Sequence, residues 1–221
     1  MLTKERSFWF GEYNTWKHWN CILTQKDITP PEPKTNYVEL DGMSGSLDLS
    51  EALSGEVTYH DRVITATFWT CTGNYQDRAR LLREIMCILC GRRMRIIEPD
   101  SYNGFYYGRV RVTSITNTQA YAEFSIEALC DPWLYDEFQR IEYRIALEDG
   151  TNEWAYYNWG VKTVCPEIEV EGNVILTCNG ITTEATTGRY KITTFKLFPG
   201  ENTILVSGQG TVTLTVQEAT L

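Results

Sequence analysis

The sequence predicts a mainly β protein, with an α+β N-terminal domain that has one main helix and a C-terminal β-sandwich. Aromatic residues make up 13% of the 221 residues, and aromatic and β-branched side chains favour strands. Only one segment spaces its apolar residues as a helix does. From about residue 166 the chain is rich in Thr, Val and Gly, a composition typical of short strands joined by tight turns.

An aromatic stretch over residues 4–24 opens the chain. Its turn-forming residues Gly11 and Asn14 predict a strand–turn–strand unit. The three prolines within residues 30–33 cannot join a regular ladder, so they predict a stiff extended connector.

Two further strands are expected before the helix. The first covers residues 37–40 and leads into a glycine-punctuated loop over 41–48. The second covers residues 55–69, where β-branched and aromatic residues dominate.

The helix is expected over residues 75–90. Asn74 is a suitable N-cap, and Asp77 three residues later approaches a capping box. Gly91 is suited to the position after the helix end. The apolar stripe consists of Leu81, Leu82, Ile85, Met86, Ile88 and Leu89.

Strands are then expected over 94–98, 105–115 and 120–128. The segment 130–135 should close this half, because Pro132 ends strand pairing. Because the composition is Thr-, Val- and Gly-rich from about residue 166, a domain boundary is expected near residues 136–145, with an N-terminal domain over 1–137 and a C-terminal domain over 138–221.

The C-terminal part carries two clear β patterns. Asn179-Gly180 suits the type I′ turn of a two-residue hairpin. Residues 211–216 alternate polar and apolar side chains, as a half-buried strand does. Regular short strands of this kind predict a sandwich.

The charge and the cysteines exclude several classes of protein. The net charge is −9 and neither half has a basic arm, so sequence-specific nucleic-acid binding is not expected. The N-terminus lacks a signal-peptide pattern, and no apolar run reaches the roughly 18 residues of a membrane helix. The seven cysteines are therefore expected to be reduced thiols of a protein made in the cytoplasm.

No residue pattern predicts catalysis, cofactor binding or a metal site, so the protein is not expected to be an enzyme. Cys87 and Cys90 form a CxxC, but the C-terminal end of a helix disfavours a thiolate, and small buried or half-buried hydrophobes are the expected role. His18 and His60 lack ligand partners at close spacing. A cell-wall hydrolase using the adjacent acids at 136–137 or 148–149 ranks last, since such pairs are usually solvated.

Two features admit two interpretations. The aromatic groups could form the core and a subunit interface, which we favour, or could stack on sugars. The arginines could form a solvated helix face or pair with acidic residues of neighbouring subunits. The aromatic groups are Phe8, Trp9, Phe10, Tyr13, Trp16 and Trp19, then Trp154, Tyr156, Tyr157 and Trp159, and the arginines are Arg78, Arg80, Arg83, Arg92, Arg93 and Arg95.

The ordered set of features resembles the distal tail protein family of siphophages, also described as phage tail family proteins. The resemblance is carried by YVELDGMSGSLD at 37–48, YHDR at 59–62 with the Phe68-Trp69 strand, the single helix, CDPWLY at 130–135, and the C-terminal segments FPGEN at 198–202 and SGQGTV at 207–212. Many relatives open the loop after the first block with Pro-Gly, where this chain has Asp41-Gly42.

The resemblance implies a structural virion protein of the tail tip, synthesised in the cytoplasm of a bacterial host. The N-terminal domain would form a homo-oligomeric ring, expected to be a hexamer, and the C-terminal sandwich would be galectin-like. The ring would act as a hub between the tail tube protein and baseplate or tail-fibre proteins, without a cofactor or a membrane. The genome would pass through its lumen, whose negative wall would repel phosphates. The alternative is a carbohydrate-binding adhesin that recognises host surface glycans.

Overall fold

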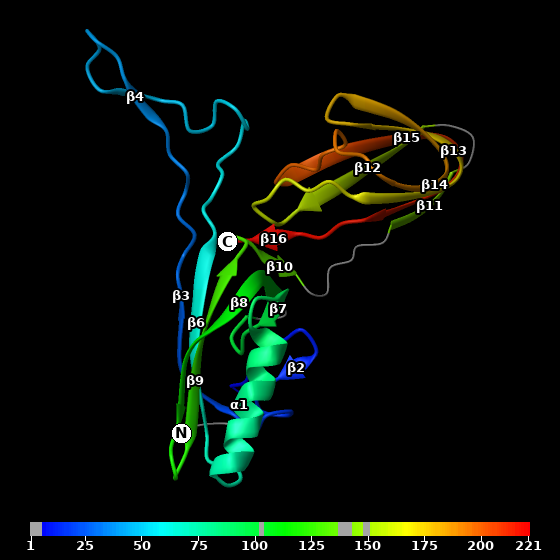
Figure 1. Cartoon of the computed structure of the whole chain (residues 1–221). Coiled ribbons are helices and arrows are strands. Elements are labelled where there is room, and N and C mark those ends of the chain that lie inside the picture. Colours follow the sequence, from blue (N-terminus) through cyan, green and yellow to red (C-terminus); the bar gives the residue numbers. More distant parts are fainter. Residues whose placement is uncertain (1–5, 102–103, 137–142, 148–150) are drawn as a thin grey trace. The chain divides into compact units, whose positions relative to one another are not determined.

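The computed structural model describes residues 6–101, 104–136, 143–147 and 151–221. The chain divides into two compact units, one that ends at Trp133 and one that runs from Leu134 to Thr220. Strands dominate both units, and the described residues contain a single helix (Figure 1). The predicted mainly β fold class with one main helix is confirmed.

The first unit is built on an antiparallel sheet with the strand order β2-β1-β7-β8-β9-β6-β3. The strands expected over 94–98, 105–115 and 120–128 correspond to β7, β8 and β9, with limits that differ by one or two residues. The seven strands are β1 (Trp9–Phe10), β2 (Tyr13–Asn14), β3 (Ile22–Ile28), β6 (Arg62–Thr70), β7 (Arg93–Ile97), β8 (Gly104–Asn117) and β9 (Ala122–Cys130).

Four phenylalanines form the centre of this unit and show that its sheet curls. Phe68 of β6 stacks on Phe124 of β9 at 5.1 Å between ring centroids, and it meets Phe8 edge-to-face at 5.6 Å. Phe10 of β1 lies 6.2 Å from the same ring. Because β1 and β6 are not neighbours in the strand order, the sheet must fold over for these buried rings to touch.

The helix α1 (Tyr75–Leu89) packs against β8, and its predicted N-terminal cap is confirmed. The side-chain oxygen of Asn74 accepts hydrogen bonds from the backbone N–H groups of Gln76 and Asp77 at 2.8 and 3.0 Å. The Asp77 carboxylate accepts one from the Asn74 N–H at 3.2 Å, which completes the capping box. After the helix, Gly91 adopts φ +79°, as expected for its position.

The apolar stripe of α1 is narrower than the sequence predicts. Leu82, Ile85 and Leu89 are buried, whereas Met86 is exposed. Leu81 and Ile88 are half-buried on one side of these three residues, and a 3.6-residue period places Met86 at the opposite margin of the stripe, where it is exposed.

Two expectations about residues 37–69 are corrected. The segment 41–48 is not all loop, because β5 (Ser46–Asp48) pairs with β4 (Tyr37–Glu39) in an antiparallel hairpin. The strand expected from residue 55 starts only at Arg62, and the preceding residues make no more than an isolated bridge between Pro33 and Tyr59. This bridge lies in the proline connector, which otherwise has the predicted extended form.

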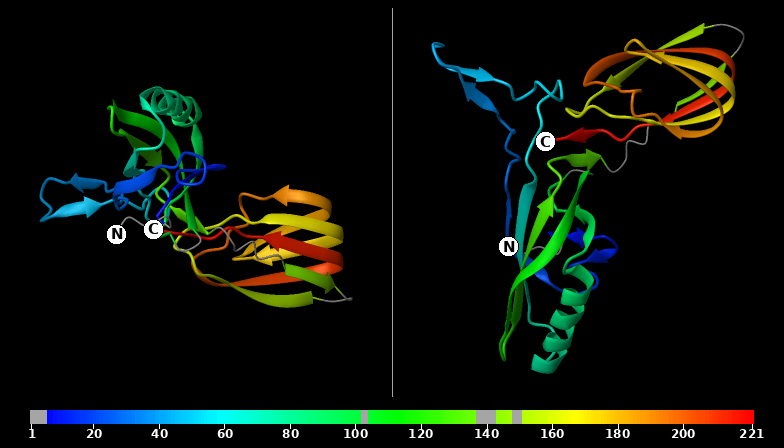
Figure 2. Two further views of the ribbon diagram at one scale, coloured as in Figure 1. Left: turned by 90° about the horizontal axis from the view of Figure 1, so that it is seen from below. Right: turned by 45° about the horizontal axis from the view of Figure 1, so that its top comes forward.

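Residues 29–61, here called the arm, leave the first sheet between β3 and β6. The arm is held at its root by the hydrogen bond from the Thr29 N–H to the Val63 carbonyl, at 2.9 Å. It is a thin two-stranded ribbon that extends beyond the end of β3 and β6 (Figures 1 and 2). A two-stranded ribbon without a packed face gains little stability from its own contacts.

The second unit contains one five-stranded sheet of order β11-β15-β13-β14, in which β12 also pairs with β15. Leu134 and Tyr135 were expected to close the first half of the chain. They form the start of β10 (Leu134–Asp136), which pairs with β16 (Ala219–Thr220). The sheet strands are β11 (Tyr143–Leu147), β12 (Thr151–Asn158), β13 (Glu167–Cys178), β14 (Ile181–Lys191) and β15 (Gly200–Thr215).

A glycine pair curls this sheet into a sandwich-like arrangement (Figure 2). Gly172 of β13 and Gly210 of β15 face each other with φ +113° and +137°, a backbone region that L side chains rarely adopt. A methyl group at Gly210 would overlap the carbonyl oxygen of Glu171. The curled sheet encloses an apolar core that includes Ile168, Leu176, Phe195, Ile204 and Leu214.

The predicted Asn179-Gly180 hairpin is confirmed. It joins β13 to β14, and the two residues adopt φ +50° and +78°, as a type I′ turn requires. The alternation predicted over residues 211–216 also holds, because Val212, Leu214 and Val216 are buried and the residues between them are partly exposed.

Candidate functional site

The residues with possible catalytic or metal chemistry are not brought together. The described residues include no group of three or more His, Cys, Asp and Glu that could hold a metal ion. His18 accepts a hydrogen bond at Nδ1 from the Asn14 N–H at 2.8 Å, and His60 is an exposed arm residue. Of the adjacent acids at 136–137 and 148–149, only Asp136 lies within the described residues. No helix in the described part of the chain is long and apolar enough to span a membrane.

The prediction of buried or half-buried side chains for Cys87 and Cys90 is wrong, because both thiols are exposed. At 100° per residue, Cys87 lies on the side of α1 opposite the buried row of Leu82, Ile85 and Leu89. Cys90 is the C-cap and has already left the helical conformation. The apolar neighbours in sequence therefore do not indicate which way these thiols face.

Arg78 fits neither interpretation given for the six arginines, a solvated helix face or pairing with neighbouring subunits. Its side chain is buried, and it donates hydrogen bonds to the carbonyl oxygens of Gly73, Thr118 and Gln119 at 2.5, 2.9 and 2.9 Å. Arg78 thereby fixes the start of α1 to the turn between β8 and β9. Arg93 pairs within the chain, with the Asp131 carboxylate at 2.6 Å.

A partly buried charge cluster joins β3 to the end of β7. The Lys26 ammonium pairs with the Glu98 carboxylate and, at 2.7 Å, with Asp100. The side chains of Lys26 and Glu98 are 20% and 5% exposed. The hydrogen bond from Lys26 lowers the pKa of Asp100 below its ordinary value, and Arg6 assists at 3.2 Å. The cluster anchors the edge strand from which the arm departs.

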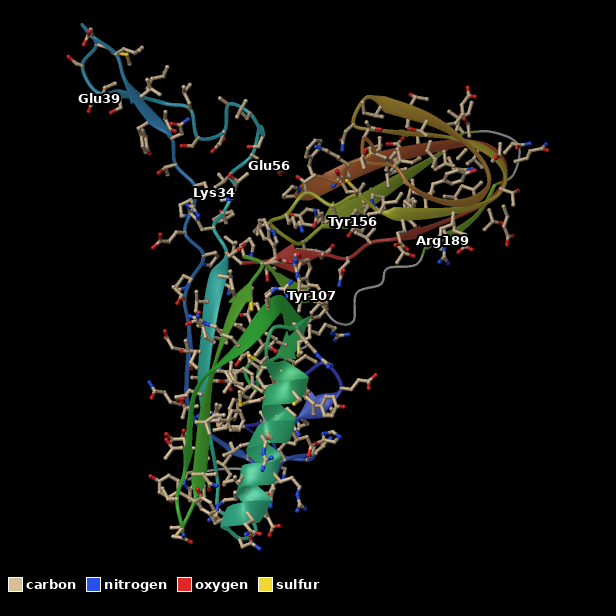
Figure 3. The ribbon with its side chains drawn as sticks, viewed as in Figure 1. Lys34, Glu39, Glu56, Tyr107, Tyr156 and Arg189 are labelled. Atoms are coloured by element: carbon tan, nitrogen blue, oxygen red, sulfur yellow. The ribbon has the colours of Figure 1, made fainter. Side chains whose placement is uncertain are left out.

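The arm is an exposed apolar surface. Figure 3 shows side chains along the ribbon, Glu39 among them, pointing away from its backbone. Tyr37 is 60% exposed, and Leu53 is fully exposed. The other large apolar side chains exposed on the arm are Leu40, Met43, Leu47 and Val57. Several large apolar side chains exposed on so thin a ribbon are typical of a surface that another chain covers.

The first aromatic group is mainly core, as we favoured. Phe8, Phe10 and Trp19 are buried, and Tyr13 stacks on Trp19 at 5.8 Å between ring centroids.

The second aromatic group divides by strand alternation. Tyr156 is buried and Trp154 packs against the same core, whereas Tyr157 and Trp159 are 49% and 72% exposed. An exposed tryptophan on the second unit is the feature that the glycan-binding alternative requires.

The fold and these surfaces define a class: a β-rich protein of two units, with a projecting apolar arm and, among the described residues, no clustered metal-binding groups. No family model matches the chain, and no curated protein matches it.

A solved structure with the same fold is the SPP1 Dit (gp 19.1) protein, described as a paradigm of the hub adsorption apparatus in phages that infect Gram-positive bacteria. The match covers 97% of this chain and 99% of that chain, with a TM-score of 0.65 and 13% sequence identity. The expected resemblance to siphophage distal tail proteins is thus confirmed at the level of the fold.

Proposed function

We propose that the protein is a structural component of a phage tail tip, where copies of it form a ring that joins the tail tube to baseplate or tail-fibre proteins. The observation that carries the proposal is the fold match along nearly the whole chain to a phage hub protein. The expected ring size, from the family resemblance, is six. The protein acts by assembly and not by catalysis.

The arm supports self-assembly on physical grounds. Its apolar side chains cannot pack against a ribbon only two strands wide, so they gain free energy only when another chain covers them. A head-to-tail contact, in which the arm of one copy lies on the next copy, closes into a ring when its rotation permits. In this arrangement the N-terminal unit forms the ring and the C-terminal unit projects from it.

Light scattering across a range of protein concentrations, combined with negative-stain images, tests the proposal. We expect a discrete ring of about six copies. A monomer at every concentration would contradict self-assembly.

Replacing Leu40 and Leu53 of the arm by Ser tests the contact itself. Removing two leucines from a covered surface should cost about 3 kcal/mol per interface, which is a weakening of roughly 100-fold. The matched control is Ile181→Ser in the second unit, where a partly exposed isoleucine follows a tight turn. A ring that tolerates the arm substitutions but not the control would place the contact elsewhere.

A further inference from the structure

We propose that Tyr157 and Trp159 form a binding platform for an uncharged pyranose glycan on the second unit. Trp159 is 72% exposed and Tyr157 49% exposed, and their ring centroids lie 4.3 Å apart. The two rings contact each other at a tilt of 48°, so they present adjacent aromatic groups at one place on the surface. This site goes beyond the proposed tail assembly, which depends on the arm.

A buried carboxylate holds the backbone beneath the platform. Glu218 is buried, and its Oε1 accepts a hydrogen bond from the Tyr156 hydroxyl at 2.5 Å. The same oxygen accepts one from the backbone N–H of Trp159 at 3.3 Å. The segment that carries the exposed indole is therefore tied to the core although the indole itself packs little.

A buried amide secures the other side of the turn. The Asn158 side-chain oxygen accepts a hydrogen bond from the Gly160 N–H at 3.0 Å, and its NH₂ group donates to the carbonyl oxygens of Lys162 and Leu197 at 3.0 and 3.3 Å. The Val161 N–H also donates to a β16 carbonyl at 3.0 Å. Together with the bond from Trp159 to Glu218, these hydrogen bonds number five and fix the turn before any ligand binds. Such preorganisation lowers the entropic cost of binding.

The groups around the platform select the class of ligand. Tyr157 pairs across the strands with Glu201, so both side chains project from the outer face of the sheet with Cβ atoms about 4.5–5.5 Å apart. Glu153 and Thr203 are exposed on the same face. An ionised carboxylate only accepts hydrogen bonds, and a sugar hydroxyl donates them.

A pyranose ring matches this arrangement, because it presents apolar C–H groups to an aromatic face and hydroxyl groups at its rim. The two glutamates of the outer face would repel phosphate, sulfate or sialic acid groups. The ligand is therefore expected to be uncharged. Leu205 is also exposed on this face, opposite Glu153, but Glu153 and Glu201 interrupt the apolar surface with charges, which disfavours a protein partner.

Ligand-observed NMR and calorimetry with neutral gluco-, galacto- and N-acetylglucosamine oligosaccharides test the proposal, with sialylated oligosaccharides as charged comparators. We expect neutral oligosaccharides to bind and sialylated ones to bind at least tenfold more weakly. Trp159→Ala should weaken binding roughly tenfold, and Trp159→Phe should retain part of it.

The matched control is Tyr37→Ala, which removes a similarly exposed ring from the arm. Glycan binding should survive this control, and ring assembly should survive Trp159→Ala, so the two proposals can fail independently. The absence of neutral glycan binding up to about 10 mM would overturn the inference, as would binding unchanged by Trp159→Ala. Loss of a protein contact in Trp159→Ala without any glycan binding would identify the pair as a protein-docking surface instead.

Discussion

Lys26 supplies the positive charge of the cluster that joins β3 to the end of β7, and its replacement by Met tests how this unit is held together. Met keeps most of the apolar stem and removes the ammonium group. In Lys26→Met, the Glu98 carboxylate stays in a site where its side chain is 5% exposed. The Asp100 N–H at 3.1 Å would then be its remaining hydrogen-bond donor among those seen here.

The structure gives the size of the effect. Removing one partner of a buried ion pair costs about 3–5 kcal/mol, and the partial exposure of Lys26 places this substitution near 3 kcal/mol. Glu98→Gln should cost only about 1 kcal/mol, because Lys26 keeps its contact with Asp100 at 2.7 Å. The double substitution removes the unpaired charge and should recover about 2 kcal/mol relative to Lys26→Met.

The pH dependence of the stability follows from the pKa shifts of Asp100 and Lys26. The Lys26 hydrogen bond lowers the folded-state pKa of Asp100 below 3.8, so its stabilisation is present above that pH and is lost as the pH falls through the folded pKa. For Lys26 itself burial lowers the pKa, but the hydrogen bonds and charges of Asp100 and Glu98 outweigh it and raise the pKa above 10.5. That stabilisation is present below 10.5 and is lost at higher pH, so Lys26→Met should flatten the stability curve at both ends.

Calorimetry of the first unit's unfolding transition is the assay. A loss of about 3 kcal/mol should lower the midpoint by roughly 10 °C in a unit of this size. Equal destabilisation by Lys26→Met and Glu98→Gln would refute the reasoning, since only the first leaves a buried charge unpaired. A double variant no more stable than Lys26→Met would refute it as well.

Three further predictions concern other parts of the fold. Gly210→Ala should destabilise the second unit by about 3 kcal/mol in urea unfolding, because Gly210 has φ +137° and the added methyl group would meet the Glu171 carbonyl oxygen. The control is Gly45→Ala, which also has a positive φ but open space around it and should cost about 1 kcal/mol. Arg78→Met should destabilise the first unit by about 3 kcal/mol and raise amide exchange at the start of α1, and an unchanged exchange pattern would contradict its role as a tie. At pH 8 a thiol reagent should modify the exposed Cys71, Cys87 and Cys90 within minutes, and the buried Cys21 and Cys130 only on unfolding. Burial raises the pKa of the Cys21 and Cys130 thiols to about 12, so equal rates for the two sets would contradict this.

Sequence alone determined the features that depend on neighbours along the chain. The cap of α1 at Asn74 and the Asn179-Gly180 turn were both predicted, because each requires only a side chain or a backbone angle within a few residues. The mainly β class followed from composition and from the alternation over 211–216. The resemblance to phage tail proteins also rests on sequence segments alone.

Tertiary structure decided everything that depends on residues far apart. The Lys26–Glu98 pair spans 72 positions, and Arg78 reaches carbonyl groups 40 and 41 positions away. Neither contact leaves a local pattern, so the sequence does not mark Lys26 and suggests only a solvated or intersubunit role for Arg78.

Tertiary structure also determined which side chains of the arm and of β12 are exposed. Trp159 belongs to an aromatic group of which two members pack in the core, while Trp159 and Tyr157 lie on the outer face of the sheet and are exposed. The sequence predicts a loop and strands for the arm, and the arm is exposed because no third strand pairs with β4 and β5 among the described residues. Periodicity records which side chains lie on one face of an element, but burial depends on whether another element meets that face, and this is fixed only when the whole chain has folded.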